Sequence, residues 1–241
     1  MNDKKGKRKL FHIEFKQPVT LRERIYSHLR EAIINNYFPA GQRIFDKEIA
    51  RSFNVSITPV REALLQLSVE GFVEIKSYKD IIVREISLKE ISEIYDVQAV
   101  LEGLAGKLAV PNMNGEHLSK MEKLIKKMSE YFSSNKVDKF YEINEKIHAL
   151  YIEQSGSQLI HDLVSHLNLR RKMFRYRVTF LSKKEVMEKA LEDHKNILRA
   201  FLSHDRENVE RLIIEHWRSD TRMKDFETAI QSELSRRKED M

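Results

Sequence analysis

Three histidines, one on each of three expected helices, are the residues of this chain best suited to hold a metal ion. His148 follows Asn144 by four residues, so both side chains point from one face of a helix expected at about 137–155. His194 and His216 each lie on an apolar stripe of a later helix. Imidazole commonly binds Zn²⁺ and Ni²⁺, and three imidazoles with one oxygen ligand make a plausible divalent-metal site. The alternative is three core histidines that hydrogen-bond to helix carbonyls or carboxylates.

Helices dominate the chain after residue 87, because apolar residues recur there at helical spacing between short polar breaks. Ser87 with Glu90, and Ser182 with Glu185, form the sequence pattern of a capping box. We expect helices at about 88–110, 115–133, 137–155, 158–178, 183–203 and 206–236. Six helices with short connections predict an antiparallel bundle.

Residues 46–71 read as two short helices joined by a tight turn. Asn54 tolerates the left-handed conformation that ends the first helix, and Ser56 is a suitable N-cap for the second. Pro59 suits the first turn of that helix, and Gly71 ends it. This pattern is typical of a helix-turn-helix, whose second helix presents its N-terminal residues to a DNA major groove. An ordinary hairpin of two helices is the alternative.

The flanking segments complete a winged helix-turn-helix. Thr20 and Glu23 form a capping box that opens an earlier helix, and residues 72–83 predict a β-hairpin, the wing. The chain is therefore expected to be mainly α and to have three parts: a basic flexible arm at 1–17, a winged helix-turn-helix domain at 18–84 and an all-helical domain at 85–241.

Positive charge is concentrated in the N-terminal third. Lys and Arg outnumber Asp and Glu by 43 to 37 in the whole chain and by 16 to 10 in residues 1–84, which suits phosphate contacts. The absence of cysteine excludes disulfides and thiolate chemistry and fits a reducing cytoplasm. No segment has the length and apolarity of a membrane span, and no apolar core follows the N-terminal charges as in a signal peptide, so we expect a cytoplasmic protein.

The chain resembles transcription regulators of the GntR family, FadR subfamily, with an FCD-type C-terminal domain. NVSITPVREALLQLSVEGFVE at 54–74 is close to the DNA-binding signature of that family. The C-terminal likeness lies in IYDVQAVLEGLAGKLA at 94–109, NEKIHALYIEQSGS at 144–157, EDHKNILRAF at 192–201 and EHWRSD at 215–220. The resemblance covers residues 20 to about 225. It implies a homodimer that binds a pseudo-palindromic operator, commonly as a repressor, and a helical domain that binds a small organic acid near a divalent metal.

The resemblance also assigns the metal ligands and the effector site. The metal ligands would be Asn144, His148, His194 and His216, with Asn in place of the family's Asp. This exchange keeps an oxygen ligand but removes a negative charge, so it should weaken cation binding. Gln98 replaces an Arg that is a candidate anchor for a carboxylate effector, and we expect Arg171 or Arg175 to supply the positive charge instead.

Six residues are expected to contact DNA: Lys47, Ser56, Ile57, Thr58, Arg61 and Tyr78. Ile57 replaces a DNA-reading Arg and can contact only a thymine methyl group, and Tyr78 replaces a common wing-tip Gly. Arg61 should matter most, unless it forms a surface ion pair with Glu62 or Glu48.

Two other functions stay open: a metal-dependent hydrolase with a DNA-binding appendage, and an architectural DNA-binding protein without an effector. A hydrolase would need a general base beside the metal, and Glu145 should point away from the face that carries Asn144. We therefore expect no enzymatic activity.

Overall fold

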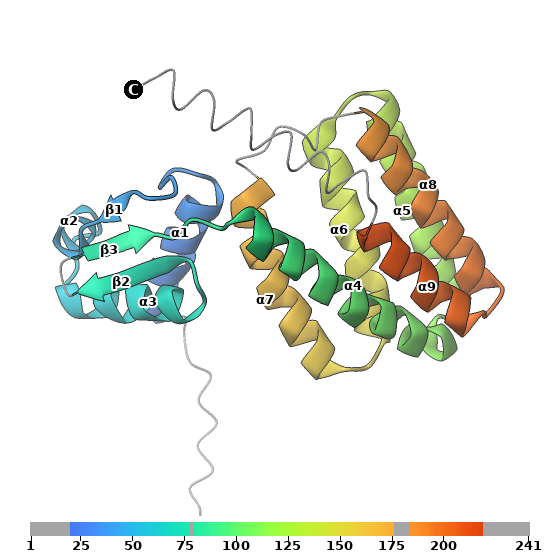
Figure 1. Ribbon diagram of the computed structural model, residues 1–241, viewed down its shortest axis with the longest axis horizontal. Coiled ribbons are helices and arrows are strands. Elements are labelled where there is room, and N and C mark those ends of the chain that lie inside the picture. The colour runs from blue at the N-terminus through green and yellow to red at the C-terminus, as the bar shows by residue number, and fades with distance from the viewer. Residues whose placement is uncertain (1–19, 78–79, 176–183, 219–241) are drawn as a thin grey trace, which may run out of the picture.

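The computed structural model describes residues 20–77, 80–175 and 184–218. Within these residues a small winged-helix unit is followed by a larger bundle of helices (Figure 1). This arrangement confirms the expected fold class. None of the described helices is long and apolar enough to cross a membrane.

The winged-helix unit contains α1 (Leu21–Ile34), α2 (Asp46–Ser52) and α3 (Ile57–Val69). Asn54 and Gly71 have positive φ angles of 51° and 79°, so each helix ends where its residue type predicts. Ser56 occupies the N-cap position of α3, but its side chain makes no capping hydrogen bond, contrary to expectation. Pro59 stands at the third helical position and has no N–H, which removes one of the two backbone donors that an N-cap side chain ordinarily uses.

The wing is a three-stranded antiparallel sheet in the order β1-β3-β2. β2 (Val73–Ser77) and β3 (Asp80–Val83) form the expected hairpin, and the residues of its tip, Tyr78 included, lie outside the described residues. β1 (Arg43–Ile44) was not expected, because two residues are too few to show an alternating pattern. It pairs with β3 through Arg43 opposite Ile82 and Ile44 opposite Ile81.

The bundle begins with α4 (Leu88–Ala109), the short 3₁₀ turn η1 (Val110–Asn112) and α5 (Gly115–Ser133). It continues with α6 (Val137–Gln154), α7 (Gln158–Arg175), α8 (Lys184–Leu202) and α9 (Arg206–Trp217). The sequence predicts that α7 ends at about 178 and α9 at about 236. Both positions lie outside the described residues, as does Ser182.

Close packing of α4 against α9 brings the two ends of the helical domain together. A Cβ atom added at Gly106 would lie 2.2 Å from Cδ1 of Ile213, and one at Gly103 would lie 2.6 Å from Cγ1 of Ile214. Glycine therefore allows a backbone approach that larger residues would prevent. This approach places the face of α4 that carries Glu102 next to His216 and Trp217 of α9.

Candidate metal centre and effector cavity

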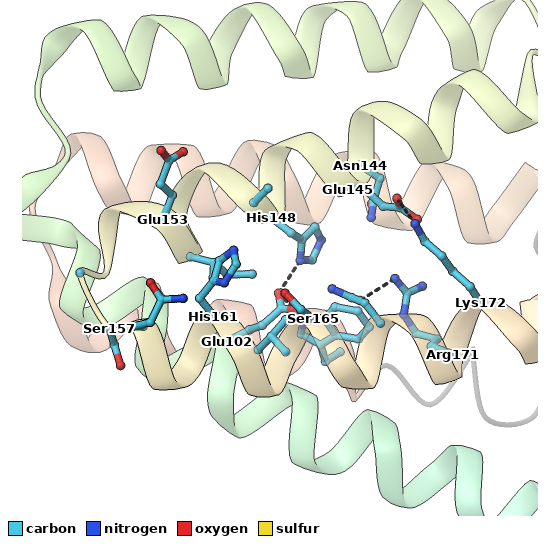
Figure 2. Close-up of a pocket in the computed structure, with 17 residues that line it drawn as sticks. Glu102, Asn144, Glu145, His148, Glu153, Ser157, His161, Ser165, Arg171 and Lys172 are labelled. Atoms are coloured by element: carbon cyan, nitrogen blue, oxygen red, sulfur yellow. Dashed lines mark hydrogen bonds and ion pairs between the residues drawn. The ribbon is translucent and has the colours of Figure 1, made fainter. Parts of the chain in front are cut away.

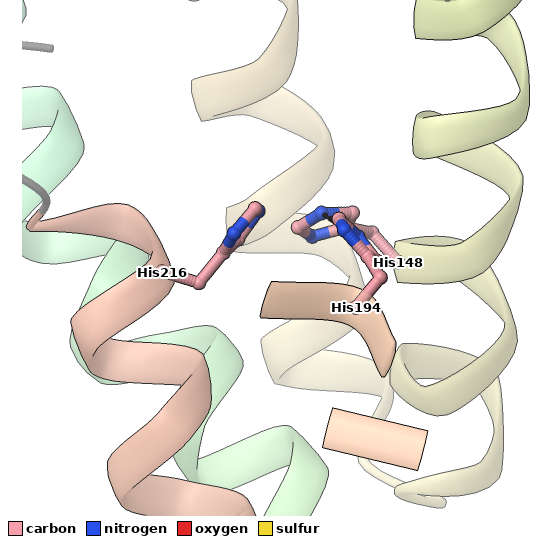
Figure 3. Close-up of side chains that lie close together, drawn as sticks. All are labelled: His148, His194 and His216. Carbon is pink, nitrogen blue, oxygen red and sulfur yellow. Dashed lines mark hydrogen bonds between the residues drawn. The ribbon is translucent and has the colours of Figure 1, made fainter. Parts of the chain in front are cut away.

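The three histidines expected from the sequence meet in the core of the bundle (Figure 3). His148 comes from α6, His194 from α8 and His216 from α9, and one nitrogen of each lies within 4.8 Å of the others. All three side chains are buried. Nε2 of His148 and Nε2 of His194 are 3.2 Å apart. Nitrogens about 3.3 Å apart are expected for two ligands of one tetrahedral ion with metal–nitrogen bonds of about 2.0 Å.

Each imidazole also presents its Nδ1 atom to a carboxylate or carbonyl oxygen. Nδ1 of His148 lies 2.7 Å from Oη of Tyr151 as well, but that hydroxyl donates its proton to Glu102. The distances from Nδ1 are 2.5 Å to Oε2 of Glu102 for His148, 2.6 Å to the carbonyl oxygen of Ala190 for His194, and 3.1 Å to Oδ2 of Asp193 for His216. These acceptors favour a proton on Nδ1, which makes Nε2 the nitrogen whose lone pair can bind a metal ion. Two such lone pairs would repel each other at 3.2 Å, and a cation bound by both nitrogens would remove that repulsion.

Glu102, on α4, is a residue of this site that the sequence reading did not identify. Its buried carboxylate accepts hydrogen bonds from Tyr151 Oη at 2.5 Å, Trp217 Nε1 at 3.1 Å and Gln98 Nε2 at 2.8 Å, besides the contact with His148. Burial by itself raises the pKa of Glu102. The positive charge that His148 can carry and the hydrogen bonds outweigh burial, so the pKa lies below its ordinary value.

A sequence signal for Glu102 does exist. Gln98 and Glu102 are four residues apart, and they interrupt a helical stripe that otherwise contains the buried residues Ile91, Tyr95 and Ala105. A glutamate at a core position of an amphipathic helix needs a buried partner, because an unpaired buried charge is very unfavourable. The two polar residues on this apolar stripe therefore indicate that α4 belongs to the site, together with the three helices that carry the histidines.

A cavity of about 560 Å³ opens beside His148 between α6 and α7 (Figure 2). Asn144, one helical turn before His148, lies on its wall, and so do Arg171 and Lys172 from α7. Trp217 and Glu102 border the same space. The cavity therefore joins His148 of the cluster to a wall on which Arg171 and Lys172 stand beside the carboxylates of Glu145 and Glu153.

Arg171 is a buried cation on this wall. Its Nη2 donates to Oδ1 of Asn168 at 3.0 Å, and its guanidinium lies over the ring of Trp217, 5.3 Å from the ring centre. Its Nε is buried without a hydrogen-bond partner, and among the described residues no carboxylate pairs with it. A buried charge with so little compensation favours an anion in the adjoining cavity. Arg175 ends α7, and its side chain lies outside the described residues.

Gln98 is fully buried behind the cavity wall. Its Nε2 donates to Oε1 of Glu102 and, at 2.7 Å, to Oδ1 of Asn168, so it connects the histidine cluster to the residue that holds Arg171. Among the described residues, its own Oε1 has no hydrogen-bond partner. Gln98 thus acts between the two ends of the site and is not one of the residues that line the cavity.

Glu145 lines the cavity together with Asn144, although it was expected to point away from that face. The cavity spans more of the α6 surface than the ligand stripe does, because α7 packs beside α6 and leaves both positions facing the gap. The Glu145 carboxylate lies 2.9 Å from Nζ of Lys172. Glu145 is therefore engaged in an ion pair and is not placed to serve as a general base.

The expected DNA-contacting residues lie mostly on one exposed surface around the N-terminus of α3. Lys47, Ser56, Thr58 and Arg61 are exposed, and Ile57 is partly buried against the core. Arg61 does form an ion pair, but its partner is Asp46 of α2, at 2.7 Å, and neither Glu62 nor Glu48. The contact uses Nε, which leaves the terminal nitrogens available for DNA.

Comparisons with known proteins agree with this architecture. Residues 21–83 match the model of "Bacterial regulatory proteins, gntR family", and residues 93–219 match the FCD domain model. The transcriptional repressor RspR of Escherichia coli is 26% identical over 200 residues, 83% of this chain and 86% of its own. The uncharacterized HTH-type regulator YdhC of Bacillus subtilis is 25% identical over 197 residues, 81% of this chain and 87% of its own.

Solved structures show the same fold. E. coli McbR/YncC superposes with a TM-score of 0.68 at 20% identity, covering 86% of this chain and 97% of that one. A putative GntR regulator from Rhodococcus sp. RHA1 gives a TM-score of 0.64 at 21% identity, covering 88% and 97%. Regulators of this type are not enzymes. This chain belongs to the GntR family and is a transcriptional regulator that combines a DNA-binding winged helix with an FCD effector-binding domain.

Proposed function

We propose that this protein is a homodimeric repressor that binds a palindromic operator and responds to a small organic acid held beside a divalent metal ion. The observation that supports the proposal is a cavity that is bordered by His148, one of the three convergent histidines, and by the buried Arg171, which pairs with no carboxylate among the described residues. Repression is supported by the likeness to RspR of Escherichia coli, a transcriptional repressor that is 26% identical to this chain.

The metal would be Zn²⁺ or Ni²⁺, because three neutral imidazole nitrogens converge on one point. Asn144 can supply an oxygen ligand from the cavity wall, and open coordination positions would face the cavity. The ion would provide a fixed positive charge for an anionic effector. The protein would supply the ligand atoms, and the acceptors of the three Nδ1 atoms would orient the imidazoles.

The effector would be a small carboxylate that reaches the metal at one end and Arg171 at the other. A guanidinium binds a carboxylate through two parallel hydrogen bonds, and Arg171, which borders the cavity, pairs with no carboxylate among the described residues. Lys172 adds a second cation, which is already paired with Glu145. Both Arg171 and Lys172 belong to α7, so the effector would contact this helix directly.

The dimer would form through the outer face of α4 and α7, where apolar side chains are exposed. These are Val97, Val100 and Leu104 of α4 and Leu163 of α7. α4 and α7 pack side by side (Figure 1), and Leu167 borders the same surface hollow as Val97, so the apolar residues of both helices adjoin. A twofold axis through this face would pair it with itself, and a dimer with such symmetry matches a palindromic operator.

Metal content tests the first part of this proposal. Protein purified without a histidine tag and dialysed against Zn²⁺ or Ni²⁺ should contain close to one ion per chain by elemental analysis. Less than about 0.2 ion per chain would reject the metal site and with it an effector held by an ion.

A thermal-shift screen of small carboxylates, with and without Zn²⁺, tests the second part. A ligand of the native state raises the unfolding temperature, and the largest shifts should require Zn²⁺. Arg171→Ala should remove the shift, whereas Arg211→Ala, at an exposed ion pair on α9, should keep it. A carboxylate shift that is the same in Arg171→Ala would show that another group holds the anion.

A further inference from the structure

Glu90 lies between two arginines where the winged-helix unit meets the bundle. Its Oε2 accepts a hydrogen bond from Nη2 of Arg84 at 3.1 Å, and its Oε1 accepts one from Nη2 of Arg170. Arg84 follows strand β3 of the wing, Glu90 is in the first turn of α4, and Arg170 is in α7. One partly buried carboxylate therefore joins three elements of the two domains.

The capping of α4 explains why the Glu90 side chain is available. Ser87 caps the helix by accepting a hydrogen bond from the backbone N–H of Glu90 at 3.1 Å, which is half of the expected capping box. In a full box the glutamate side chain would turn back to the N-cap backbone. Here it turns to the two arginines. Glu90 therefore belongs to a capping-box pattern in the sequence, but its side chain makes a contact between domains.

The end of helix α3 reaches the same cluster. A Cβ atom at Gly71 would lie 3.0 Å from Nη1 of Arg84 and 3.6 Å from Nε of Arg170. The backbone at Gly71, with its positive φ, thus lies against both guanidiniums. The turn that follows the helix with the DNA-contacting residues therefore lies against Arg170 of α7 and against Arg84.

The charges in this cluster are not balanced, because one carboxylate faces two guanidiniums. Nε of Arg170 is buried and has no hydrogen-bond partner within the described part of the chain. Burial lowers the pKa of Arg170, and the nearby positive charge of Arg84 lowers it further. Without Glu90 the two arginines would repel each other, so the link between Arg84 and Arg170 depends on this carboxylate, beside the separate contact of α1 with α7.

Helix α7 connects this cluster to the cavity. Arg170 and Arg171 are consecutive, and successive side chains on a helix point about 100° apart. Arg171 therefore lines the cavity while Arg170 contacts Glu90, and Asn168 holds Arg171 in place. A small rotation or shift of α7 on effector binding would move both arginines together.

We propose that Arg84, Glu90 and Arg170 form a latch that fixes the orientation of the DNA-binding domain on α7 and couples the cavity to operator affinity. The coupling rests on the function proposed above for the cavity. The fixed orientation does not, because it follows from contacts within the chain alone.

Distance measurements test the latch without any effector. The chain has no cysteine, so Glu31→Cys on α1 and Lys120→Cys on α5 accept spin labels specifically. Dilution with unlabelled protein leaves one labelled chain per dimer. Glu90→Gln should at least double the width of the distance distribution. Glu93→Gln, an exposed residue one turn along α4 that pairs with Lys89, should leave it unchanged. Equal widths in Glu90→Gln and the parent would overturn the latch. Arg170→Met provides a second variant for the same comparison.

Operator binding tests what the latch does. Glu90→Gln should bind a single half-site within about twofold of the parent, because the DNA-contacting residues are untouched. It should bind the two-half-site operator at least about fivefold more weakly, because the second domain must then be oriented during binding. An unchanged ratio between the two sites would overturn the proposed role in orientation.

Zn²⁺ alone serves as the probe of coupling. Glu90→Gln should bind the same amount of Zn²⁺ as the parent and should lose most of the change in operator affinity that Zn²⁺ causes in the parent. A variant that keeps the full change would overturn the coupling. If Zn²⁺ does not change the operator affinity of the parent, regulation by the metal site is contradicted. The distance measurement would then still test whether the latch fixes the orientation of the DNA-binding domain.

Discussion

The DNA-contacting surface of α3 and the histidine cluster of the bundle assemble polar residues in opposite ways. On α3, Ser56, Thr58 and Arg61 lie within six consecutive residues and are exposed, so one helix positions them all. In the bundle, the histidines come from α6, α8 and α9 and are buried, and Glu102 joins them from α4. A change on α3 should therefore alter DNA binding alone, whereas a change in the cluster should alter both ligand binding and folding.

The largest effect is expected from His194→Ala. His194 is fully buried and provides one of three convergent nitrogens, so its loss should reduce Zn²⁺ affinity by more than the 10- to 100-fold that is typical of losing an outer-shell partner. The measurement is Zn²⁺ competition with a chromophoric chelator. His161→Ala is the control, because His161 borders the same cavity but lies outside the cluster. Equal Zn²⁺ affinity of the His194 variant and the parent would mean that the cluster is only structural.

Glu102→Gln should have the next largest effect. The amide has only one oxygen, whereas the carboxylate receives hydrogen bonds from His148, Tyr151, Trp217 and Gln98, so at least one buried donor loses its acceptor. We expect a 10- to 100-fold loss of Zn²⁺ affinity and about 1–3 kcal/mol less stability to urea in the metal-free protein. Glu153→Gln, on the exposed rim of the cavity, should change neither value. Unaltered metal affinity with lowered stability would assign Glu102 to folding alone.

The same difference between the two regions decides how much the sequence could predict. The helix-turn-helix was predictable because Asn54, Pro59 and Gly71 act on their own backbone, and the capping box of Thr20 and Glu23 forms as expected. The order of the bundle helices was predictable from apolar periodicity. Strand β1 was not, because its two residues gain their structure only from pairing with β3.

The candidate site shows the same limit. Three histidines on apolar stripes indicated a shared site, and the structure brings them together. The acceptors of their Nδ1 atoms could not be assigned, because Glu102 and Asp193 become partners only when α4 and α8 pack against the other helices. Likewise, Asp46 rather than a neighbour on α3 pairs with Arg61, because α2 and α3 meet at an angle that the sequence does not specify.

Arg61→Ala tests the other side of the comparison. It should cost about 1–3 kcal/mol of operator binding and leave thermal stability nearly unchanged, because Arg61 is exposed. Gel-shift titration at fixed salt measures the first value. Asp46→Asn separates the two roles of Arg61: it breaks the ion pair but keeps the guanidinium, so operator binding should fall less than in Arg61→Ala. Equal losses in both variants would mean that the ion pair, and not a DNA contact, is what matters.

Asn144→Asp should have the smallest effect and the opposite sign. It adds a negative charge on the cavity wall one helical turn from His148, so Zn²⁺ affinity should rise, by about tenfold or less in a partly hydrated site. Salt distinguishes the two ways in which this charge can act. If the new carboxylate binds the ion directly, the gain in affinity should persist at about 1 M salt, where the screening length is about 3 Å. If it acts only through the field in the cavity, the gain should fade as salt rises. A variant with no gain at low salt would show that position 144 lies too far from the histidines to contribute, and the metal site would then consist of residues from the buried cluster alone.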